Sequence, residues 1–224
     1  MSGIVGSRLN TRGSGLVGSL GSDGQVLTSA GAGKGIVFEA AGGGQSTLVS
    51  TVTSSDDATA SFTDIDDSYR NYVVTFNDLV PVTDNVTFLF LASHDNGSNY
   101  DGSITNAFHH TGNYDDDTGF ESEGNPAYSR GNDTDGVAFA FGVGSASLEC
   151  CNGFLYIYNP GKLYSSVVLT HFYCHFNNTN YNSHGAYATD VNGHIDSASA
   201  VDAIQFKFSS GNIESGTFKL WGQA

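Results

Sequence analysis

The chain has 224 residues with 23 acidic and 8 basic side chains, a formal net charge of −15, and 39% hydrophobic residues. This length suits one large all-β domain, or a domain of about 180 residues preceded by an arm. A chain this acidic repels phosphate backbones, which argues against nucleic-acid binding. No stretch approaches the roughly 20 apolar residues of a membrane helix, so we expect no membrane insertion.

The first 44 residues differ in composition from the rest of the chain. They contain 13 of the 29 glycines and a single aromatic residue, Phe38. Such a segment has little side-chain surface to bury and loses much backbone entropy on ordering, so we do not expect it to fold alone. We predict that residues 1–44 form an extended arm laid along neighbouring subunits of a larger assembly; a disordered linker is the alternative.

A short repeat within this arm indicates how it would bind. The sequence GIVGS at residues 3–7 recurs as GLVGS at residues 15–19. Apolar pairs between glycines suit short strands that add to the edge of another chain's sheet, where backbone hydrogen bonds supply the affinity. The predicted anchoring residues are Gly3, Ile4, Val5, Gly15, Leu16 and Val17.

After a hinge with the sequence AAGGGQS, residues 45–224 carry all the remaining aromatic residues, which is ample apolar area for a core. Their apolar residues alternate with polar ones, as in half-buried strands. We expect strands at residues 60–65, 69–76, 85–91, 137–143, 154–158, 167–176, 201–208 and 217–221. Turn-forming clusters of Asn, Asp, Gly and Ser separate these runs. We predict an all-β domain, an antiparallel, jelly-roll-like β-sandwich.

The longest stretch between predicted strands, residues 96–136, is expected to be an exposed loop, and loops of this length often carry function. Its tyrosines stand among Asp, Asn and Gly residues. An aromatic ring can stack on the apolar face of a sugar while carboxylates and amides bind its hydroxyls. The predicted receptor-binding residues are Tyr100, Asp101, Tyr114 and Tyr128. Alternatively, these tyrosines fasten the loop to its own sandwich.

No pattern supports catalysis, a metal or a cofactor. The adjacent carboxylates of residues 115–117 stand in a loop without the separation that assigns acid and base roles. Residues 95–101 alternate oxygen side chains but lack the glutamate of a calcium loop, so we favour a hairpin turn. His171 and His175 share one strand face with Tyr173, and because no third zinc ligand follows, an intersubunit or solvent-facing polar row is preferred.

The three cysteines are Cys150, Cys151 and Cys174. Their odd number and the adjacent pair argue against a disulfide framework, and Cys174 is expected to pack as a small apolar residue. The N-terminus lacks the order of charged and apolar residues of a signal peptide. These observations favour assembly in a reducing cytoplasm.

Two parts of the sequence resemble known virion proteins. The arm, GIVGSRLNTRGSGLVGSLGSDGQVLTSAGAGKG, is similar to N-terminal regions of tail-fibre and other virion proteins of marine bacteriophages. The stretches FTDIDDSYRNYVVTFNDLVPVTDNVTFLFLASHDNGS and AIQFKFSSGNIESGTFKLWG resemble a domain of phage tail and minor structural proteins. In the terminal motif, the resemblance implies that residues 209–216 form a turn between core residues Phe206, Phe208, Phe218 and Leu220. The chain lacks the heptads or collagen-like repeats of a long fibre shaft.

The resemblance implies a non-enzymatic virion protein that is assembled in the cytoplasm of the bacterial host. We expect a short tail fibre or tail-associated appendage, in contact with other virion proteins of the tail or capsid, that forms a homotrimer and attaches to a host-surface glycan. A capsid decoration or head-fibre protein is the alternative within this class. A free, non-catalytic carbohydrate-binding module is a second alternative, and a depolymerase spike has little support.

Overall fold

The computed structural model describes residues 25–29, 36–40, 46–113, 119–161, 168–179, 185–197 and 199–223. The chain divides into two compact units, Met1–Ser46 and Thr47–Ala224. The predicted boundary, between residues 44 and 45, falls close to this division.

In the first unit, β1 (Gln25–Ser29) and β2 (Ile36–Ala40) form an antiparallel pair in which Gln25 lies opposite Ala40. This hairpin was not part of the predicted extended arm. The sequence signal for it is a pair of runs rich in β-branched residues on either side of a short glycine-rich connection. The six predicted anchoring residues, Gly3, Ile4, Val5, Gly15, Leu16 and Val17, lie outside the described residues.

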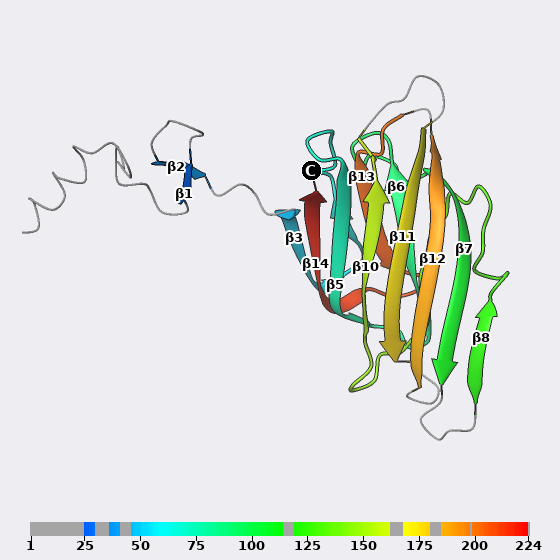
Figure 1. Ribbon diagram of the computed structural model, residues 1–224. Coiled ribbons are helices and arrows are strands. Elements are labelled where there is room, and N and C mark those ends of the chain that lie inside the picture. The colour runs from blue at the N-terminus through cyan, green and yellow to red at the C-terminus, as the bar shows by residue number, and fades with distance from the viewer. Residues whose placement is uncertain are drawn as a thin grey trace, which may run out of the picture. The chain divides into compact units, whose positions relative to one another are not determined.

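The second unit is an antiparallel β-sandwich, which confirms the predicted fold class (Figure 1). In the described residues, the larger sheet has eight strands in the order β3-β14-β5-β10-β11-β12-β7-β8, and the smaller has four in the order β4-β13-β6-β9. The strands of the larger sheet are β3 (Ser46–Asp57), β5 (Asn71–Pro81), β7 (Ser103–Asn113), β8 (Phe120–Gly124), β10 (Cys151–Tyr158), β11 (Val168–Thr179), β12 (Ala186–Ser197) and β14 (Ile213–Gln223). The strands of the smaller sheet are β4 (Ala60–Phe62), β6 (Val86–Ser93), β9 (Val137–Val143) and β13 (Ala203–Phe208).

The strand order has a regularity that explains the jelly-roll likeness. Four strands of the larger sheet lie in the order β3-β14-β5-β10, and the four strands of the smaller sheet in the order β4-β13-β6-β9. In both sets, the strand that comes last in the chain lies between the first and the second, and the third lies at the far side. Two four-stranded sheets with this order, facing each other, make an eight-stranded jelly roll. The antiparallel pairs β7–β8 and β11–β12 are additions to this framework, and they widen only the larger sheet.

Aromatic rings from both sheets fill the space between them. The side chain of Phe76 is 1% exposed, and its ring centroid lies 4.9 Å from those of Phe176 and Phe206 and 5.6 Å from those of Phe88 and Phe218. These five residues come from five different strands. Close aromatic pairs in tilted or edge-on arrangements contribute stability beyond the area that they bury. The centre of the sandwich is therefore an aromatic cluster around Phe76.

Several predicted strand faces are confirmed. Val86, Phe88 and Phe90 are buried together, while Gln205 and Lys207 of β13 point away from the core as expected. The four residues of the terminal motif, Phe206, Phe208, Phe218 and Leu220, are all buried. The turn in that motif is shorter than expected, because β14 already begins at Ile213 and contains a bulge at Gly216, where φ is 148°.

The expected long loop over residues 96–136 is wrong, because β7 and β8 lie within it. In β7 the inward positions alternate between apolar and polar residues, with Ile104 and Phe108 beside Asn106 and His110. Half of the buried face is thus polar, and this hides the period of two that reveals a strand. Strands β3 and β12 were missed as well.

Candidate functional site

The solvent side of the larger sheet, which we call the outer face, carries two rows of side chains that run across the strands. Because neighbours in register point to the same side of a sheet, the pairing of strands β14, β5, β10, β11, β12 and β7 aligns them. The first row is Trp221, Val73, Tyr156, Tyr173, Asn192 and Ala107. The second row is Lys219, Thr75, Phe154, His175, Asp190 and His109.

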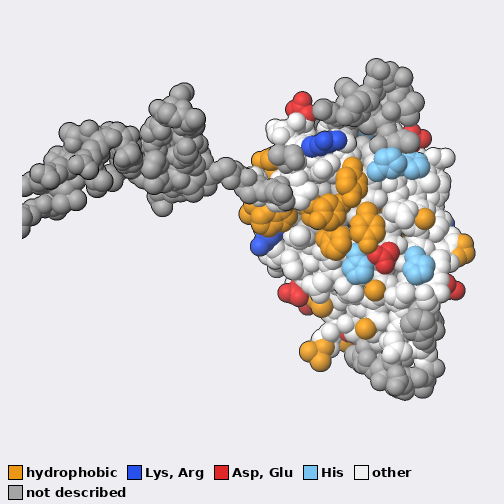
Figure 2. All heavy atoms as spheres, viewed as in Figure 1, with side chains coloured by type: hydrophobic (Ala, Val, Ile, Leu, Met, Phe, Trp, Pro, Cys, Tyr) orange, Lys and Arg blue, Asp and Glu red, His pale blue; other side chains and the backbone are white. Residues whose placement is uncertain are grey.

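Aromatic side chains stand at the centre of the outer face. Figure 2 shows them as orange groups gathered over the middle strands, with histidines in pale blue toward the side of β12 and β7. The ring of Phe154 is 5.5 Å from that of Tyr156 and 6.1 Å from that of Tyr173, while Tyr158, which is 42% exposed, stacks on Tyr156 at 6.3 Å. A contiguous aromatic patch on a solvent-facing sheet marks a binding surface more often than chance exposure does.

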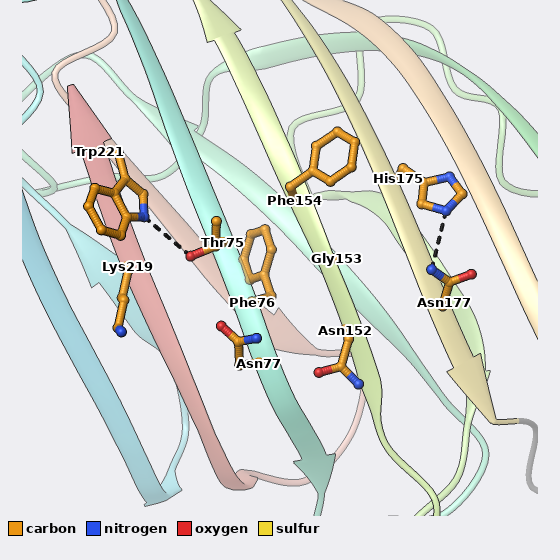
Figure 3. Close-up of a pocket in the computed structure, with 10 residues that line it drawn as sticks. All are labelled: Thr75, Phe76, Asn77, Asn152, Gly153, Phe154, His175, Asn177, Lys219 and Trp221. Carbon is orange, nitrogen blue, oxygen red and sulfur yellow. Dashed lines mark hydrogen bonds between the residues drawn. The ribbon is translucent and has the colours of Figure 1, made fainter. Parts of the chain in front are cut away.

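A shallow hollow of about 460 Å³ opens at one side of this patch (Figure 3). We call it the amide hollow, because three asparagines line it. Its lining residues are Thr75, Phe76, Asn77, Asn152, Gly153, Phe154, His175, Asn177, Lys219 and Trp221. Trp221 comes from β14 and Phe154 from β10, with the short side chain of Thr75 on the strand between them. The hollow therefore combines aromatic rings with amide, hydroxyl and ammonium groups.

Hydrogen bonds hold several of these side chains in place. The Trp221 indole Nε1 donates to Thr75 Oγ1 at 3.3 Å, and Asn177 Nδ2 lies 3.3 Å from His175 Nε2 (Figure 3). Asn152 Oδ1 accepts from the backbone N–H of Asp78 at 2.7 Å, at the bulge between β10 and β5. Side chains that are held before binding lose less entropy when a ligand arrives.

A hydrogen-bonded cluster borders the hollow on the side of β12. Asp190 Oδ1 accepts from the Tyr173 hydroxyl at 2.6 Å and lies 2.9 Å from His175 Nδ1. The hydrogen bond to Asp190, together with burial, raises the pKa of Tyr173 to about 12. Burial opposes the charge of Asp190, but the hydrogen bonds from Tyr173 and His175 hold the pKa of this carboxyl below its ordinary value. The cluster fixes the His175 ring at the edge of the hollow.

This cluster predicts a pH-dependent contribution to stability. Because the pKa of Tyr173 is raised to about 12 from its ordinary value of about 10, its stabilising effect is complete below pH 10 and is lost as the pH rises toward 12. The Tyr173→Phe variant lacks this titration. Between pH 9.5 and about 11.5, we therefore expect the melting temperature of the unmodified chain to fall by about 2 °C more than that of the variant. Equal falls in thermal melts of both proteins would contradict the role assigned to the hydrogen bond.

The predicted receptor-binding residues that the structure describes, Tyr100, Asp101 and Tyr128, do not line the amide hollow. Tyr128 is partly buried, and its ring lies 5.2 Å from that of Phe108 and 5.3 Å from that of Phe141. It therefore fastens its segment to the sandwich, which is the alternative considered above. Tyr100 is partly exposed in the connection between β6 and β7, with its hydroxyl against Gly97, and Asp101 beside it is exposed. Tyr114 lies outside the described residues, as do residues 115–117.

Sequence reasoning placed His175 on a polar row that could face solvent, but it assigned no other residue of the hollow to a site. The orientation predicted for residues 171–176 is confirmed, since Phe172, Cys174 and Phe176 are buried while His171 is exposed. In β10 and β14, buried and partly exposed residues also alternate, and Phe154 and Trp221 lie at partly exposed positions. Large aromatic residues at such positions were the signal in the sequence that could have indicated a binding surface. Their meeting depends on strand pairings between distant segments, which local patterns do not reveal.

The described residues contain no three His, Cys, Asp or Glu side chains arranged to hold a metal ion. The three cysteines, all within the described ranges, are free, and Cys151 and Cys174 are buried. No helix in the described part of the chain is long and apolar enough to cross a membrane.

Comparisons with known proteins add little to this site. No protein-family model matches the chain, and no curated protein matches it. Among solved structures, the chain was compared with a candidate pore-forming toxin from Bacteroides vulgatus at 7% sequence identity, over 81% of this chain and 64% of that one. The TM-score of 0.08 is too low to carry an argument about fold or function.

Proposed function

We propose that this chain is a non-enzymatic attachment protein of a bacteriophage particle and that its jelly-roll body binds host-surface carbohydrate in the amide hollow. The observation that carries the binding role is the juxtaposition of Trp221 and Phe154 with three asparagine side chains in one solvent-open hollow. Sugars present apolar C–H faces and a rim of hydroxyls. Aromatic rings contact the former, and amides, which both donate and accept, bind the latter.

The openness of the hollow suits attachment better than turnover. A shallow site on a rigid sheet leaves most of a ligand exposed to water and holds it weakly. Many weak sites on one particle nevertheless give high avidity, since each further contact forms at a high effective concentration. This is the behaviour required of a protein that attaches a particle to a cell surface.

The role in the particle rests on the division of the chain. A glycine-rich unit, Met1–Ser46, precedes a self-contained sandwich. An arm that docks on tail or capsid proteins while the body faces outward, in a homotrimer, fits this division. Copy number separates the alternatives within this class: a tail appendage is present in small multiples of the tail symmetry, and a capsid decoration in far larger numbers.

Deleting residues 1–44 is expected to separate the two roles. The shortened chain should bind the same glycans as the full chain on an array of bacterial surface saccharides, because the hollow lies within the body. It should be absent from purified particles, in which the full chain is found by mass spectrometry. Incorporation of the shortened chain would contradict the anchoring role, and loss of glycan binding would contradict the assignment of the site.

A free carbohydrate-binding module is the second candidate function, and the same amide hollow favours it. This alternative predicts that the full chain binds glycans but is missing from purified particles. Product release from any bound saccharide would contradict both proposals, because neither includes catalysis.

A further inference from the structure

We infer that the ligand of the amide hollow is an anionic oligosaccharide that carries carboxylate groups and lies across the strands of the outer face. This inference rests on the proposed carbohydrate binding and names the class of saccharide. It depends on two independent observations. The first is the sign of the charge in the hollow, and the second is the length over which aromatic side chains of the first row extend across the strands.

The charge of the hollow is opposite to that of the chain. The sequence has 23 acidic and only 8 basic residues, yet none of the described residues that line the hollow is Asp or Glu, whereas one of them is Lys219. Within the described residues, Lys219 has no ion-pair partner, so its ammonium group is available to a ligand. The acidic surface elsewhere repels an anion, and this hollow accepts one.

His175 lines the opposite side of the hollow, but both of its ring nitrogens have partners, Asp190 Oδ1 at 2.9 Å and Asn177 Nδ2 at 3.3 Å, so Lys219 is the group in the lining that an anion would meet. Lys219 lies on β14 and His175 on β11, with β5 and β10 between them. Among the described residues, the carboxylate that contacts His175 is that of Asp190, whose Oδ1 also accepts a hydrogen bond from the Tyr173 hydroxyl. Asp190 therefore orients the histidine, and it is not itself among the described residues that line the hollow.

The aromatic side chains of the first row, Trp221, Tyr156 and Tyr173, indicate a ligand longer than one sugar. Trp221 on β14 is in register with Tyr156 on β10 and Tyr173 on β11 through Val73. Neighbouring strands lie about 4.8 Å apart, so the row extends over about 14 Å between β14 and β11. A chain of several sugar rings can contact the whole row, with one of its carboxylates beside Lys219.

Binding of matched oligosaccharides tests the inference. We would titrate the full chain with hexamers of galacturonic and of mannuronic acid, and with the same hexamers after reduction of their carboxyl groups to alcohols. Isothermal titration calorimetry should show at least one acidic hexamer binding about 10-fold more tightly than its reduced form, with a difference that shrinks as salt is added.

The Lys219→Gln variant should lower the affinity for that acidic hexamer by about 5- to 10-fold and for the reduced form much less. Lys207→Gln is the matched control, because Lys207 points outward from β13 of the smaller sheet, and it should leave both affinities unchanged. Equal or tighter binding of the reduced hexamers, or an effect of Lys207→Gln as large as that of Lys219→Gln, would overturn the inference. If neutral glycans bind on the array but no acidic hexamer binds, the inference of an anionic ligand is wrong and the proposed carbohydrate function stands. If no glycan binds at all, the inference and the proposed carbohydrate function are both wrong.

Discussion

Replacing Trp221 with alanine is expected to weaken oligosaccharide binding by about 30-fold, because the indole is the largest aromatic surface in the amide hollow. An aromatic anchor at the centre of a binding site typically contributes about 2 kcal/mol when truncated, which corresponds to this change in Kd. The hydrogen bond from its Nε1 to Thr75 Oγ1 fixes the ring, so little of that contribution is lost to ordering. Calorimetric titration of the full-length variant with the best glycan from the array would measure the effect.

Tyr100→Ala is the matched control for Trp221→Ala. Tyr100 is, like Trp221, a partly exposed aromatic residue, but it lies in the connection between β6 and β7 and does not line the hollow. Its replacement should change the Kd less than twofold, and Trp221→Phe should retain most of the binding. If Tyr100→Ala reduces affinity more than Trp221→Ala does, the binding site lies in the loop that sequence analysis favoured.

Replacing Phe76 with alanine should destabilise the body by about 3 to 5 kcal/mol, the range found for deleting a buried phenylalanine. Phe76 is 1% exposed and contacts rings from β6, β11, β13 and β14, which belong to both sheets. Its removal leaves a cavity between the sheets that rigid strands cannot close. Urea denaturation followed by tryptophan fluorescence would measure the free energy of unfolding, with Trp221 as the chain's one tryptophan.

A control for this experiment is Val82→Ala, since Val82 is 50% exposed just after β5. Its effect should stay within about 0.5 kcal/mol, as for other surface substitutions. Where Phe76→Ala fails to fold, Phe76→Leu keeps most of the volume and should still cost more than about 1 kcal/mol. An effect of Phe76→Leu no larger than that of Val82→Ala would show that Phe76 is not at the centre of the core.

The parts of the fold that could be predicted are those with a clean alternation of apolar and polar residues. Strands β6 and β13 have it, with Phe88 and Phe206 on their buried faces. Strand β7 lacks it because buried Asn106 and His110 interrupt its apolar face. Asn106 is accommodated there by hydrogen bonds to the backbone of residues 128 and 130, which only the folded chain brings near.

For the candidate site, the sequence could predict the types of side chain but not the particular residues that meet. The predicted combination of aromatic rings and amides also occurs in the hollow, but the prediction named Tyr100, Asp101, Tyr114 and Tyr128, which stand in one stretch of sequence. The hollow instead assembles side chains from four strands, with Trp221 and Thr75 separated by more than half of the chain. Such a site depends on the register of β14 against β5, and register is a property of the whole sheet.

Mapping the bound oligosaccharide by nuclear magnetic resonance tests the assignment of the site most directly. In a titration of the isotopically labelled full chain with the tightest-binding hexamer, we expect the largest shifts at the indole N–H of Trp221 and at the backbone amides of Thr75, Phe154, Asn177 and Lys219. Amides of β13, in the opposite sheet, should not move. Shifts centred on the smaller sheet or on the connection that holds Tyr100, with none at Trp221, would contradict a carbohydrate site on the outer face.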